Sequence, residues 1–401
     1  MKKLITTSIL GFLLAVGCKP EKTEESGYAL LVSNELDFER NEIVSFEAKK
    51  LLAKFEDTSI DDIHIKDSTG KTIRHQWVDY DKDGKPEEFL FMAKVGANKT
   101  STYKIVSDSS FSMPEKEAVA YSRFVPERTD DYAWENDKVA FRTYGPTGQK
   151  EALEGVAGST LSSGIDVWLK RTNKSIINKW YAEHVKNPGY YHTDHGEGYD
   201  PYHVGNSRGL GGIGIFEDDS LYVSQNFMEY KTIVSGPLKT IFELSYDPWG
   251  PYKVKETKRI SLALGSHFSK FEIRLESVKD VPNYAAGITL HNNEGEYKIN
   301  KEEGWIMHWE SIDDTKVGEG IVMQPAEIDS AFAYISKVPD QSNLLITTTP
   351  KSTFTYYAGF AWEKSGDVSS KEDWIKMLQK QAKIITSPLK VDLEKALQNK
   401  N

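Results

Sequence analysis

Residues 188–214 concentrate side chains that can carry out proton-transfer chemistry. Of the nine histidines in the chain, three lie in this stretch. The candidate groups are His192, His195, His203, Tyr190, Tyr191, Tyr199, Tyr202, Asp194, Glu197, Asp200 and Arg208. Such a set can remove a proton, deliver one, and neutralise a carboxylate. Glycine, aspartate, tyrosine and proline are also common in long surface loops, but the density of titratable groups favours an active site here.

A second segment, residues 123–146, is unusually rich in charged and aromatic side chains for a connection between strands. Two interpretations are open: structural ion pairs on the face of a sheet, or one wall of a sugar-binding cleft. The residues that would line such a cleft are Trp134, Glu135, Asp137 and Arg142. If the segment forms one regular strand, Glu135 and Asp137 share one face while Trp134 and Arg142 share the other. The sequence does not indicate which face meets the cleft.

Residues 79–84 begin like a calcium loop, because a glycine that permits a sharp bend follows three alternating carboxylates, Asp79, Asp81 and Asp83. The distal glutamate of an EF-hand is not at the required spacing and the flanks are strand-like, so an acidic hairpin turn without metal is an equal expectation. A mononuclear site that uses one of the three histidines of residues 188–214 with an acid also stays open. A divalent cation is therefore possible, and no cofactor is firmly indicated.

The sequence context excludes two motifs: one for dinucleotide binding and one for a serine nucleophile. Residues 209–214 satisfy G-x-G-x-x-G, but no βαβ pattern surrounds them and the residues that follow read as a strand, which excludes a dinucleotide site. We expect these glycines to let the backbone turn tightly beneath the histidine-rich loop. Residues 205–209 also satisfy G-x-S-x-G, but the residues that follow read as a strand and not as the helix of a nucleophile elbow, so acyl transfer by a serine has no support.

The first 18 residues have the features of a bacterial export signal. Two lysines precede an apolar run that ends at Gly17 and Cys18, the only cysteine in the chain. This order resembles the lipoprotein box, in which the chain is cut before Cys18 and the new terminus is acylated. Residues 19–27 would then be a flexible tether. We expect an outer-membrane lipoprotein, facing the periplasm or the medium, that meets the membrane only through its lipid; ordinary secretion is the alternative.

Composition and periodicity predict a mainly β protein. The net charge of −10 argues against nucleic acid as a partner. Short alternating segments in residues 28–106 predict a small antiparallel β sandwich. The polar residues 107–118 are expected to link it to a larger antiparallel β sandwich, residues 119–401, that carries the catalytic site. Helical periodicity appears mainly near the C-terminus, where one apolar face is formed by Trp374, Met377, Leu378 and Ala382.

Two stretches carry a resemblance to a known family: RFVPERTDDYAWENDKVAFRTYGP, residues 123–146, and YYHTDHGEGYDPYHVG, residues 190–205. They resemble a family catalogued as a domain of unknown function and encoded in polysaccharide utilisation loci of Gram-negative bacteria that digest algal and plant cell walls. Within it, the chain is similar to an oligosaccharide dehydratase of ulvan degradation. The resemblance implies removal of water from the glucuronic or iduronic acid at the non-reducing end of a sulfated oligosaccharide. The product would be a 4,5-unsaturated uronyl residue.

This reaction requires three roles. The proton at C5 is barely acidic, so the enzyme must neutralise the neighbouring carboxylate, remove the proton, and protonate the departing C4 hydroxyl. Arg208, Arg142 or a metal ion could hold the carboxylate. One of the three histidines of residues 188–214 could be the base, with His291 and His308 as further candidates. The acid would come from Tyr190, Tyr191 and Tyr199.

Two alternatives to a dehydratase stay open. An exo-acting polysaccharide lyase would use the same elimination to expel a sugar rather than water. A glycan-binding lipoprotein without chemistry would instead stack sugar rings on tryptophans, for which the candidates are Trp134, Trp180, Trp249 and Trp305. A binding protein has no use for several titratable histidines in one loop, which favours an enzyme.

Overall fold

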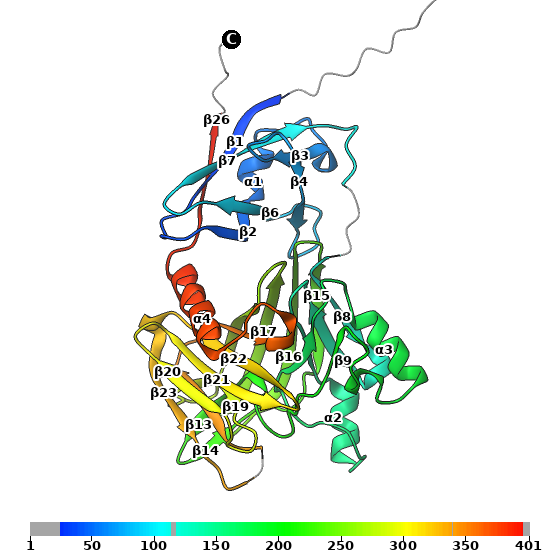
Figure 1. The fold of residues 1–401 in the computed structure, drawn as a ribbon, viewed down its shortest axis with the longest axis vertical. Coiled ribbons are helices and arrows are strands. Elements are labelled where there is room, and N and C mark those ends of the chain that lie inside the picture. The colour runs from blue at the N-terminus through cyan, green and yellow to red at the C-terminus, as the bar shows by residue number, and fades with distance from the viewer. Residues whose placement is uncertain (1–24, 114–117, 339, 396–401) are drawn as a thin grey trace, which may run out of the picture.

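The computed structural model describes residues 25–113, 118–338 and 340–395. The expected export signal and Cys18 lie outside the described residues. Within them, antiparallel sheets form a small N-terminal domain and a larger domain below it (Figure 1), which confirms the predicted mainly β class. Among the described residues, no helix is both long enough and apolar enough to cross a membrane.

The N-terminal domain is a sandwich of two sheets around its own apolar core. The first sheet contains, in spatial order, β26 (Lys390–Lys395), β1 (Glu25–Ser33), β7 (Thr100–Ser107), β3 (Ile63–Lys66) and β4 (Thr72–Ile73). The second contains β2 (Arg40–Glu47), β6 (Glu88–Val95) and β5 (His75–Val78), and α1 (Ala48–Leu52) follows β2. Leu30, Phe91 and Ile105 are among the core residues that the two sheets bury.

The strand β26 departs from the expected domain boundaries. Residues 119–401 were expected to form the larger domain, yet Val391 and Leu393 pair with Val32 and Leu30 of β1. The chain therefore returns to the N-terminal sheet after the larger domain is complete. An exposed, strongly charged strand of only six residues carries little periodic signal, and its partner lies at the other end of the chain.

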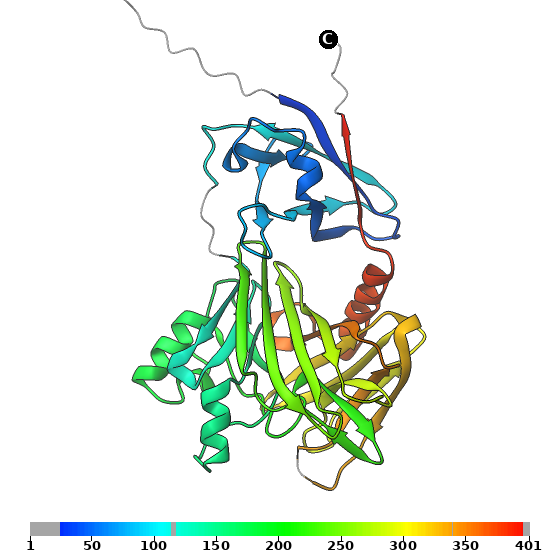
Figure 2. The same ribbon diagram turned by 180° about the vertical axis from the view of Figure 1, so that it is seen from behind.

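The larger domain contains an eight-stranded sheet that packs against two five-stranded sheets. The eight-stranded sheet runs β15 (Glu229–Ser235), β16 (Lys239–Trp249), β17 (Val254–Ala263), β18 (Phe268–Glu276), β25 (Thr353–Trp362), β22 (Thr315–Val322), β21 (Trp305–Ile312) and β20 (Glu296–Asn300). Figure 2 shows the long strands of its first half from behind. One five-stranded sheet runs β14 (Ser220–Tyr222), β13 (Leu210–Glu217), β19 (Tyr284–Thr289), β24 (Asn343–Thr348) and β23 (Ile328–Tyr334). The other runs β12 (Gly198–Tyr199), β11 (Asp166–Lys170), β10 (Ala140–Thr143), β9 (Asp131–Glu135) and β8 (Tyr121–Val125).

Aromatic contacts tie these sheets into one core. Tyr132 of β9 stacks on Phe242 of β16 with ring centroids 4.2 Å apart, and Phe141 of β10 meets Phe360 of β25 at 5.2 Å. The same core continues into the sheet that contains β13 and β19. The site-bearing loop is therefore mounted on a rigid, closely packed support.

Three helices cover the edges of the larger domain: α2 (Pro146–Leu153), α3 (Ile177–Lys186) and α4 (Lys371–Thr386). The predicted C-terminal helix is confirmed as α4, which buries Trp374, Leu378 and Ala382. It packs on β22, where a Cβ at Gly318 would lie 2.6 Å from the Trp374 ring and one at Gly320 would lie 2.4 Å from Leu378. These two glycines thus let the helix approach the sheet closely.

The glycine-rich residues 209–214 open β13 rather than a helix. Gly209 has a φ of +53°, and a Cβ there would lie 2.0 Å from the carbonyl oxygen of Ile165, with which Gly209 forms a parallel bridge. Only glycine fits this conformation and approach, so Gly209 lets the chain pass close to Ile165 where β13 begins.

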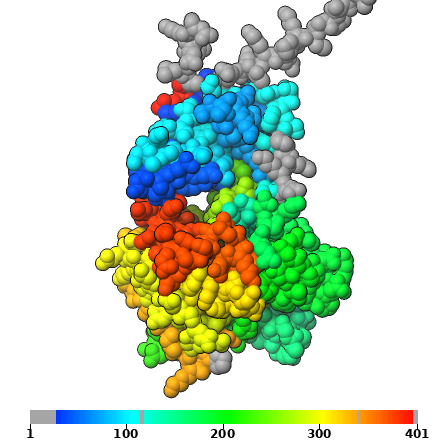
Figure 3. Space-filling view, viewed as in Figure 1, coloured from blue at the N-terminus to red at the C-terminus, as the bar shows by residue number. Residues whose placement is uncertain are grey.

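The two domains meet through β5 and the start of β16. The Gln76 side chain donates to the Lys239 carbonyl and accepts the backbone N–H groups of Leu238 and Lys239. Beside this contact lies a hollow of about 720 Å³ between the N-terminal domain and α4, visible in Figure 3, with Arg40 and Lys380 among its lining residues.

Candidate active site

A row of charged side chains lies buried between one sheet and α3. Successive residues in a strand point to opposite faces. Trp134 and Phe141 enter the main core on one face, while Ala133 and Trp168 pack beneath α3 on the other. The charged residues in register with the second face are buried as well; they are Asp131, Glu135, Arg142, Asp166 and Lys170.

Arg142 is the centre of this charged face. It stands opposite Asp166 in the register of β10 and β11, and its Nε donates to Asp166 Oδ2 at 2.6 Å. Its Nη2 donates to Asp200 Oδ2 at 2.8 Å, and its Nη1 lies 3.7 Å from Asp131 Oδ2. Because three carboxylates surround this guanidinium and only 6% of the side chain is exposed, Arg142 is committed to protein partners rather than to a substrate carboxylate.

Burial raises the pKa values of three carboxyl groups in this cluster. Burial raises the pKa of Asp131 to about 6, although Arg142 and Arg128 oppose the shift. Burial also raises the pKa of Asp166, and burial together with the charge of Asp166 raises the pKa of Asp200 well above its usual range. The Oδ1 atom of each carboxyl group has no hydrogen-bond partner among the described residues. These carboxyl groups therefore keep their protons to a higher pH than exposed carboxyl groups do.

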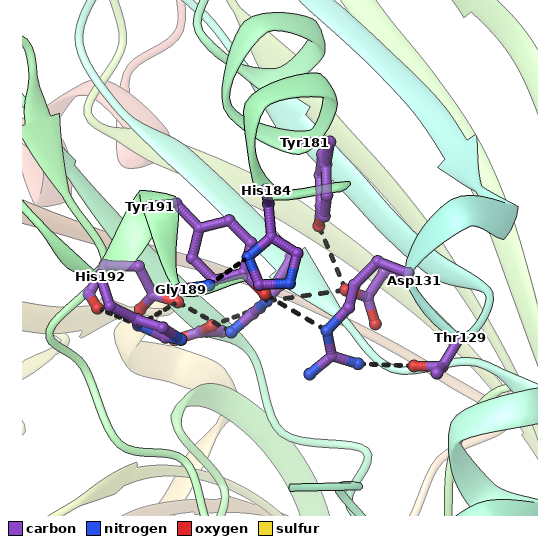
Figure 4. Close-up of polar contacts among 11 residues, drawn as sticks. Thr129, Asp131, Tyr181, His184, Gly189, Tyr191 and His192 are labelled. Carbon is purple, nitrogen blue, oxygen red and sulfur yellow. Dashed lines mark hydrogen bonds and ion pairs between the residues drawn. The ribbon is translucent and has the colours of Figure 1, made fainter. Parts of the chain in front are cut away.

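Tyr191 connects this cluster to the histidine-rich loop. It belongs to a single 3₁₀ turn, Tyr190–His192, and its ring is buried between Trp168 and His184, with centroid distances of 5.0 and 4.2 Å. Its hydroxyl oxygen accepts from Arg142 Nη1 and from Arg128 Nε, both at 3.2 Å (Figure 4). No acceptor among the described residues receives the hydroxyl proton of Tyr191. Two guanidinium donors would stabilise the phenolate that forms if this proton is given away.

His192 is oriented at the edge of the cluster. Its Nδ1 lies 2.8 Å from the backbone carbonyl oxygen of Asp200 and 3.6 Å from Oδ2 of the same residue. A carbonyl oxygen can only accept, so Nδ1 carries the proton and Nε2 keeps a free lone pair. The side chain is 54% exposed. Figure 4 shows His192 on the side of Tyr191 away from Thr129. His192 thus has the geometry of a general base that is open to a ligand.

Arg128 and His184 complete the surroundings of Tyr191, although no sequence pattern singles out either residue. Arg128 is partly exposed and donates from Nη1 to Thr129 Oγ1 at 2.6 Å. No acceptor among the described residues bonds its Nη2. His184 Nδ1 accepts the Gly189 N–H at 3.0 Å, and burial with the nearby charge of Arg128 lowers its pKa. Arg128 lies in one of the two stretches that carry the family resemblance, but only the fold indicates its proximity to Tyr191.

The other candidates of the loop are spread along it. His195 stacks on Tyr190 with ring centroids 4.0 Å apart and lies on the exposed surface. The Tyr199 hydroxyl donates to Asp313 at 2.7 Å. His203 Nε2 lies 3.2 Å from Asp340. The metal site considered for His192, His195 and His203 has no support, since neither group of potential metal ligands found among the described residues includes any of them.

Arg208 and three other candidates for substrate binding are held by the protein itself. Arg208 is 2% exposed, and its Nη1 donates to Ser163 Oγ and to the Ile213 carbonyl. Trp134 is fully buried and donates to Ser269. Glu135 pairs with Lys170 at 2.8 Å and accepts the first backbone N–H groups of α3. Asp137 accepts the Gly265 N–H from the turn after β9. In this conformation the buried members cannot meet a sugar.

Residues 131–143 form a hairpin rather than one regular strand. β9 ends at Glu135, and the Asn136 N–H bonds the Val139 carbonyl before β10 begins. Glu135 and Asp137 therefore do not share one face of a strand, because Asp137 lies in the turn. The tryptophans considered as sugar platforms are also unsuited to that role, since all four are buried: Trp134, Trp180, Trp249 and Trp305.

The acidic turn of the N-terminal domain bonds its own backbone. Asp79 accepts the N–H groups of Lys82 and Gly84, and Asp83 accepts that of Lys85. The carboxylates that come within reach of one cation are Asp79, Asp81 and Glu87, without Asp83. Exposed carboxylates that cap a turn need no metal, so the turn is explained by its own hydrogen bonds.

A second buried polar cluster lies below the loop, in β21 and β22. His308 Nδ1 is 3.0 Å from Glu319, and His291 Nδ1 is 2.9 Å from Glu310. The ring of Tyr202, from the loop, packs edge-on against His291 at 4.9 Å. Burial and the charge of Glu319 raise the pKa of Tyr202 well above its usual range. No hydrogen bond of good geometry joins the Tyr202 hydroxyl to Glu319.

The chain belongs to a protein family described as a domain of unknown function, DUF4861, whose model matches residues 32–391. A curated relative is the uncharacterized protein P7 of Formosa agariphila, which is 42% identical over 345 residues, covering 85% of this chain and 86% of the relative. Both resemblance-bearing segments, residues 123–146 and 190–205, lie inside the matched range.

Solved structures of similar shape come from much larger proteins. A protein of glycosyl hydrolase family 38 from Enterococcus faecalis and an alpha-mannosidase from Enterococcus faecalis V583 each match 95% of this chain with a TM-score of 0.50 and 10% identity. This chain covers 48% and 47% of those proteins, about half of their length. At this identity the similarity shows a common β architecture and nothing about activity.

Proposed function

We propose that this protein is a carbohydrate dehydratase that removes water from the uronic acid at the non-reducing end of ulvan-type oligosaccharides. The observation that carries the proposal is the orientation of His192. Its Nδ1 is bound by the Asp200 carbonyl, so the exposed Nε2 is free to accept a proton. An imidazole with a free lone pair near neutral pH suits the abstraction of a weakly acidic proton.

The neighbours of His192 supply groups for the other two roles. Arg128 is the partly exposed guanidinium beside Tyr191, and we assign it the uronate carboxylate. We assign Tyr191 the role of acid, because Arg128 and Arg142 both donate to its hydroxyl oxygen and would stabilise its conjugate base. Tyr191 is 1% exposed in this conformation, so substrate binding must displace the groups that cover its hydroxyl. Arg142 then acts as a positioning residue that does not touch the substrate.

The elimination itself is balanced by these groups. His192 Nε2 takes the proton from C5, and the electron pair of that C–H bond forms the C4–C5 double bond. The C4–O bond breaks as Tyr191 protonates the departing hydroxyl, which leaves as water. Arg128 stabilises the negative charge that develops on the carboxylate as C5 is deprotonated.

The two resemblance-bearing segments support the same assignment. Arg128 comes from residues 123–146, and Tyr191 and His192 come from residues 190–205. They meet at the Tyr191 hydroxyl although they are 63 residues apart in the chain. The two segments that carry the resemblance thus meet at one polar cluster, which supports a reaction at that cluster.

The test is incubation of the purified protein with oligosaccharides that end in glucuronic or iduronic acid. A conjugated uronyl product absorbs in the ultraviolet, and mass spectrometry identifies what has been lost. Loss of water supports the dehydratase, and loss of a sugar identifies an exo-acting lyase. Binding without any new absorbance would identify a glycan-binding protein and overturn the proposal.

We also propose that the protein is an outer-membrane lipoprotein of a polysaccharide utilisation system, acylated at Cys18. The support is the order of the apolar run, Gly17 and Cys18 in the sequence. Such an anchor would keep the enzyme close to the oligosaccharides that the cell takes up.

A further inference from the structure

Three buried side chains beneath the loop have the composition of a metal site. His308 and Glu310 lie in β21, and Glu319 lies opposite His308 in β22. Each offers one ligand atom, and these atoms all lie within 4.8 Å of one another. The residues are 1%, 6% and 0% exposed, so the cluster lies away from bulk solvent. We propose that His308, Glu310 and Glu319 bind one divalent transition-metal ion.

The orientation of the imidazole supports this proposal. His308 Nε2 lies 3.0 Å from the carbonyl oxygen of Glu294, which can only accept, so Nε2 carries a proton. Nδ1 faces Glu319 Oε2, which is a second acceptor. Either another proton or a cation must lie between these two atoms. A ring nitrogen whose opposite N–H is held by a backbone carbonyl is the usual arrangement of a metal-binding histidine.

The carboxylates have unused binding capacity at the same place. Glu310 Oε1 and Glu319 Oε1 are buried and have no hydrogen-bond partner among the described residues. A buried carboxylate oxygen without a donor is costly, and a cation bound by both groups would remove that cost. The other oxygen of Glu310, Oε2, lies 2.9 Å from His291 Nδ1. The Nε2 of His291 lies 2.8 Å from the His203 carbonyl oxygen, so the imidazole holds the Glu310 carboxylate in place.

The ligand set indicates which cation to expect. Calcium and magnesium prefer sites made entirely of oxygen atoms. One imidazole with two carboxylates suits manganese, zinc or iron instead. Three protein ligands leave positions open around such an ion.

The site would fasten the loop to the sheet. Tyr202 packs on His291, and the His203 carbonyl accepts from the same imidazole. A cation between β21 and β22 would therefore order the residues that follow Asp200, the carbonyl partner of His192. This consequence does not depend on the identity of the substrate.

The experiment measures metal binding directly. The full-length mature chain, stripped with a chelator, is titrated with Mn²⁺ and followed by the electron paramagnetic resonance of the free ion; metal content after dialysis against Zn²⁺ gives the stoichiometry. We expect one tightly bound ion per chain. Glu319→Gln and His308→Gln should each abolish that ion, and His291→Gln should weaken its affinity by about 10-fold to 100-fold as an outer partner.

A matched control separates this site from the acidic turn of the N-terminal domain. Asp81→Asn removes a carboxylate from that turn and should leave the bound ion unchanged. Folding of each variant is checked by circular dichroism. If Glu319→Gln does not fold, Glu310→Gln replaces it, because Glu310 lies at the more accessible side of the cluster. If the folded, unsubstituted protein binds neither Mn²⁺ nor Zn²⁺, protons occupy the cluster and the proposal is overturned. If binding survives Glu310→Gln but not Asp81→Asn, the ion binds at the acidic turn, and the proposal is overturned as well.

Discussion

Tyr191 accepts hydrogen bonds from two guanidinium groups while its neighbour His192 faces solvent. In the proposed reaction, these two adjacent residues of one 3₁₀ turn make opposite proton transfers. The backbone links them as well, because the Asp200 N–H bonds the Tyr191 carbonyl while the Asp200 carbonyl accepts from His192. A change of the exposed His192 side chain is therefore expected to affect the reaction rather than the fold, whereas Tyr191 also packs in a buried aromatic cluster.

His192→Asn should lower the elimination rate by about 100-fold to 10,000-fold, the usual effect of removing a general base. The asparagine amide can still donate to the Asp200 carbonyl, so the loop should keep its conformation. Steady-state kinetics with a uronate-ended oligosaccharide provide the measurement. His195→Asn is the matched control, since His195 lies on the exposed surface against Tyr190. Equal activity in both variants would show that His192 is not the base.

Arg128→Met should raise KM by about 10-fold to 100-fold, since a lost hydrogen bond to a charged group costs about 1.5–3 kcal/mol. Arg123→Met removes a guanidinium from the same segment that pairs with Glu127 instead, and it should leave KM unchanged. If both variants keep the KM of the unsubstituted protein, the carboxylate must be held elsewhere.

His75 predicts a pH dependence of the N-terminal domain. Burial lowers its pKa from 6.5 to about 4. Below pH 6.5 the unfolded chain takes up this proton first, so the free energy of unfolding should fall as the pH drops towards 4, by at most about 3 kcal/mol. Urea unfolding of the unsubstituted protein and of His75→Leu at pH 7 and pH 4.5 measures the difference. A His75→Leu variant with the same pH slope would assign the effect to other groups.

At the scale of elements, alternation correctly predicts the strands and the apolar face of α4, because both depend on neighbouring residues. It does not predict the charged face beneath α3. Arg142 and Asp166 look like two surface residues in the sequence, and they become buried only because β10 pairs with β11 and α3 covers them. Arg142 and Asp200 are 58 residues apart, so no local pattern relates them. The loop was found from its density of titratable groups, whereas Arg128 and His184 required the fold.

The pairing of β26 with β1 makes a further prediction at this scale. Deleting residues 388–401 should destabilise the N-terminal domain by about 3 kcal/mol, because three partly buried side chains, Leu389, Val391 and Leu393, leave its core. Amide hydrogen exchange of β1 measures the loss of pairing. Truncation after Lys395 is the control, since it removes only residues beyond β26. Unchanged protection of β1 in the longer deletion would contradict the pairing.

For the whole molecule, the N-terminal sequence predicts attachment through a lipid. Cys18→Ser should move the protein from the membrane fraction to the soluble fraction, because no acyl chain can be added. Immunoblots of fractionated cells that express each form provide the measurement, and a conservative change in the predicted tether, Lys19→Arg, is the control. Persistence of the Cys18→Ser variant in the membrane fraction would refute the lipid anchor.

The return of the chain to its first sheet also governs the order in which the molecule can be completed. A chain emerges from the ribosome from its N-terminus, and domains usually fold in that order. Here β1, the first strand described, receives one of its two neighbours only after β26 has been synthesised. Until then its outer edge is unpaired and open to other strands. The first domain to be made is therefore the last to be finished, because its sheet is complete only once the strand near the C-terminus has been synthesised.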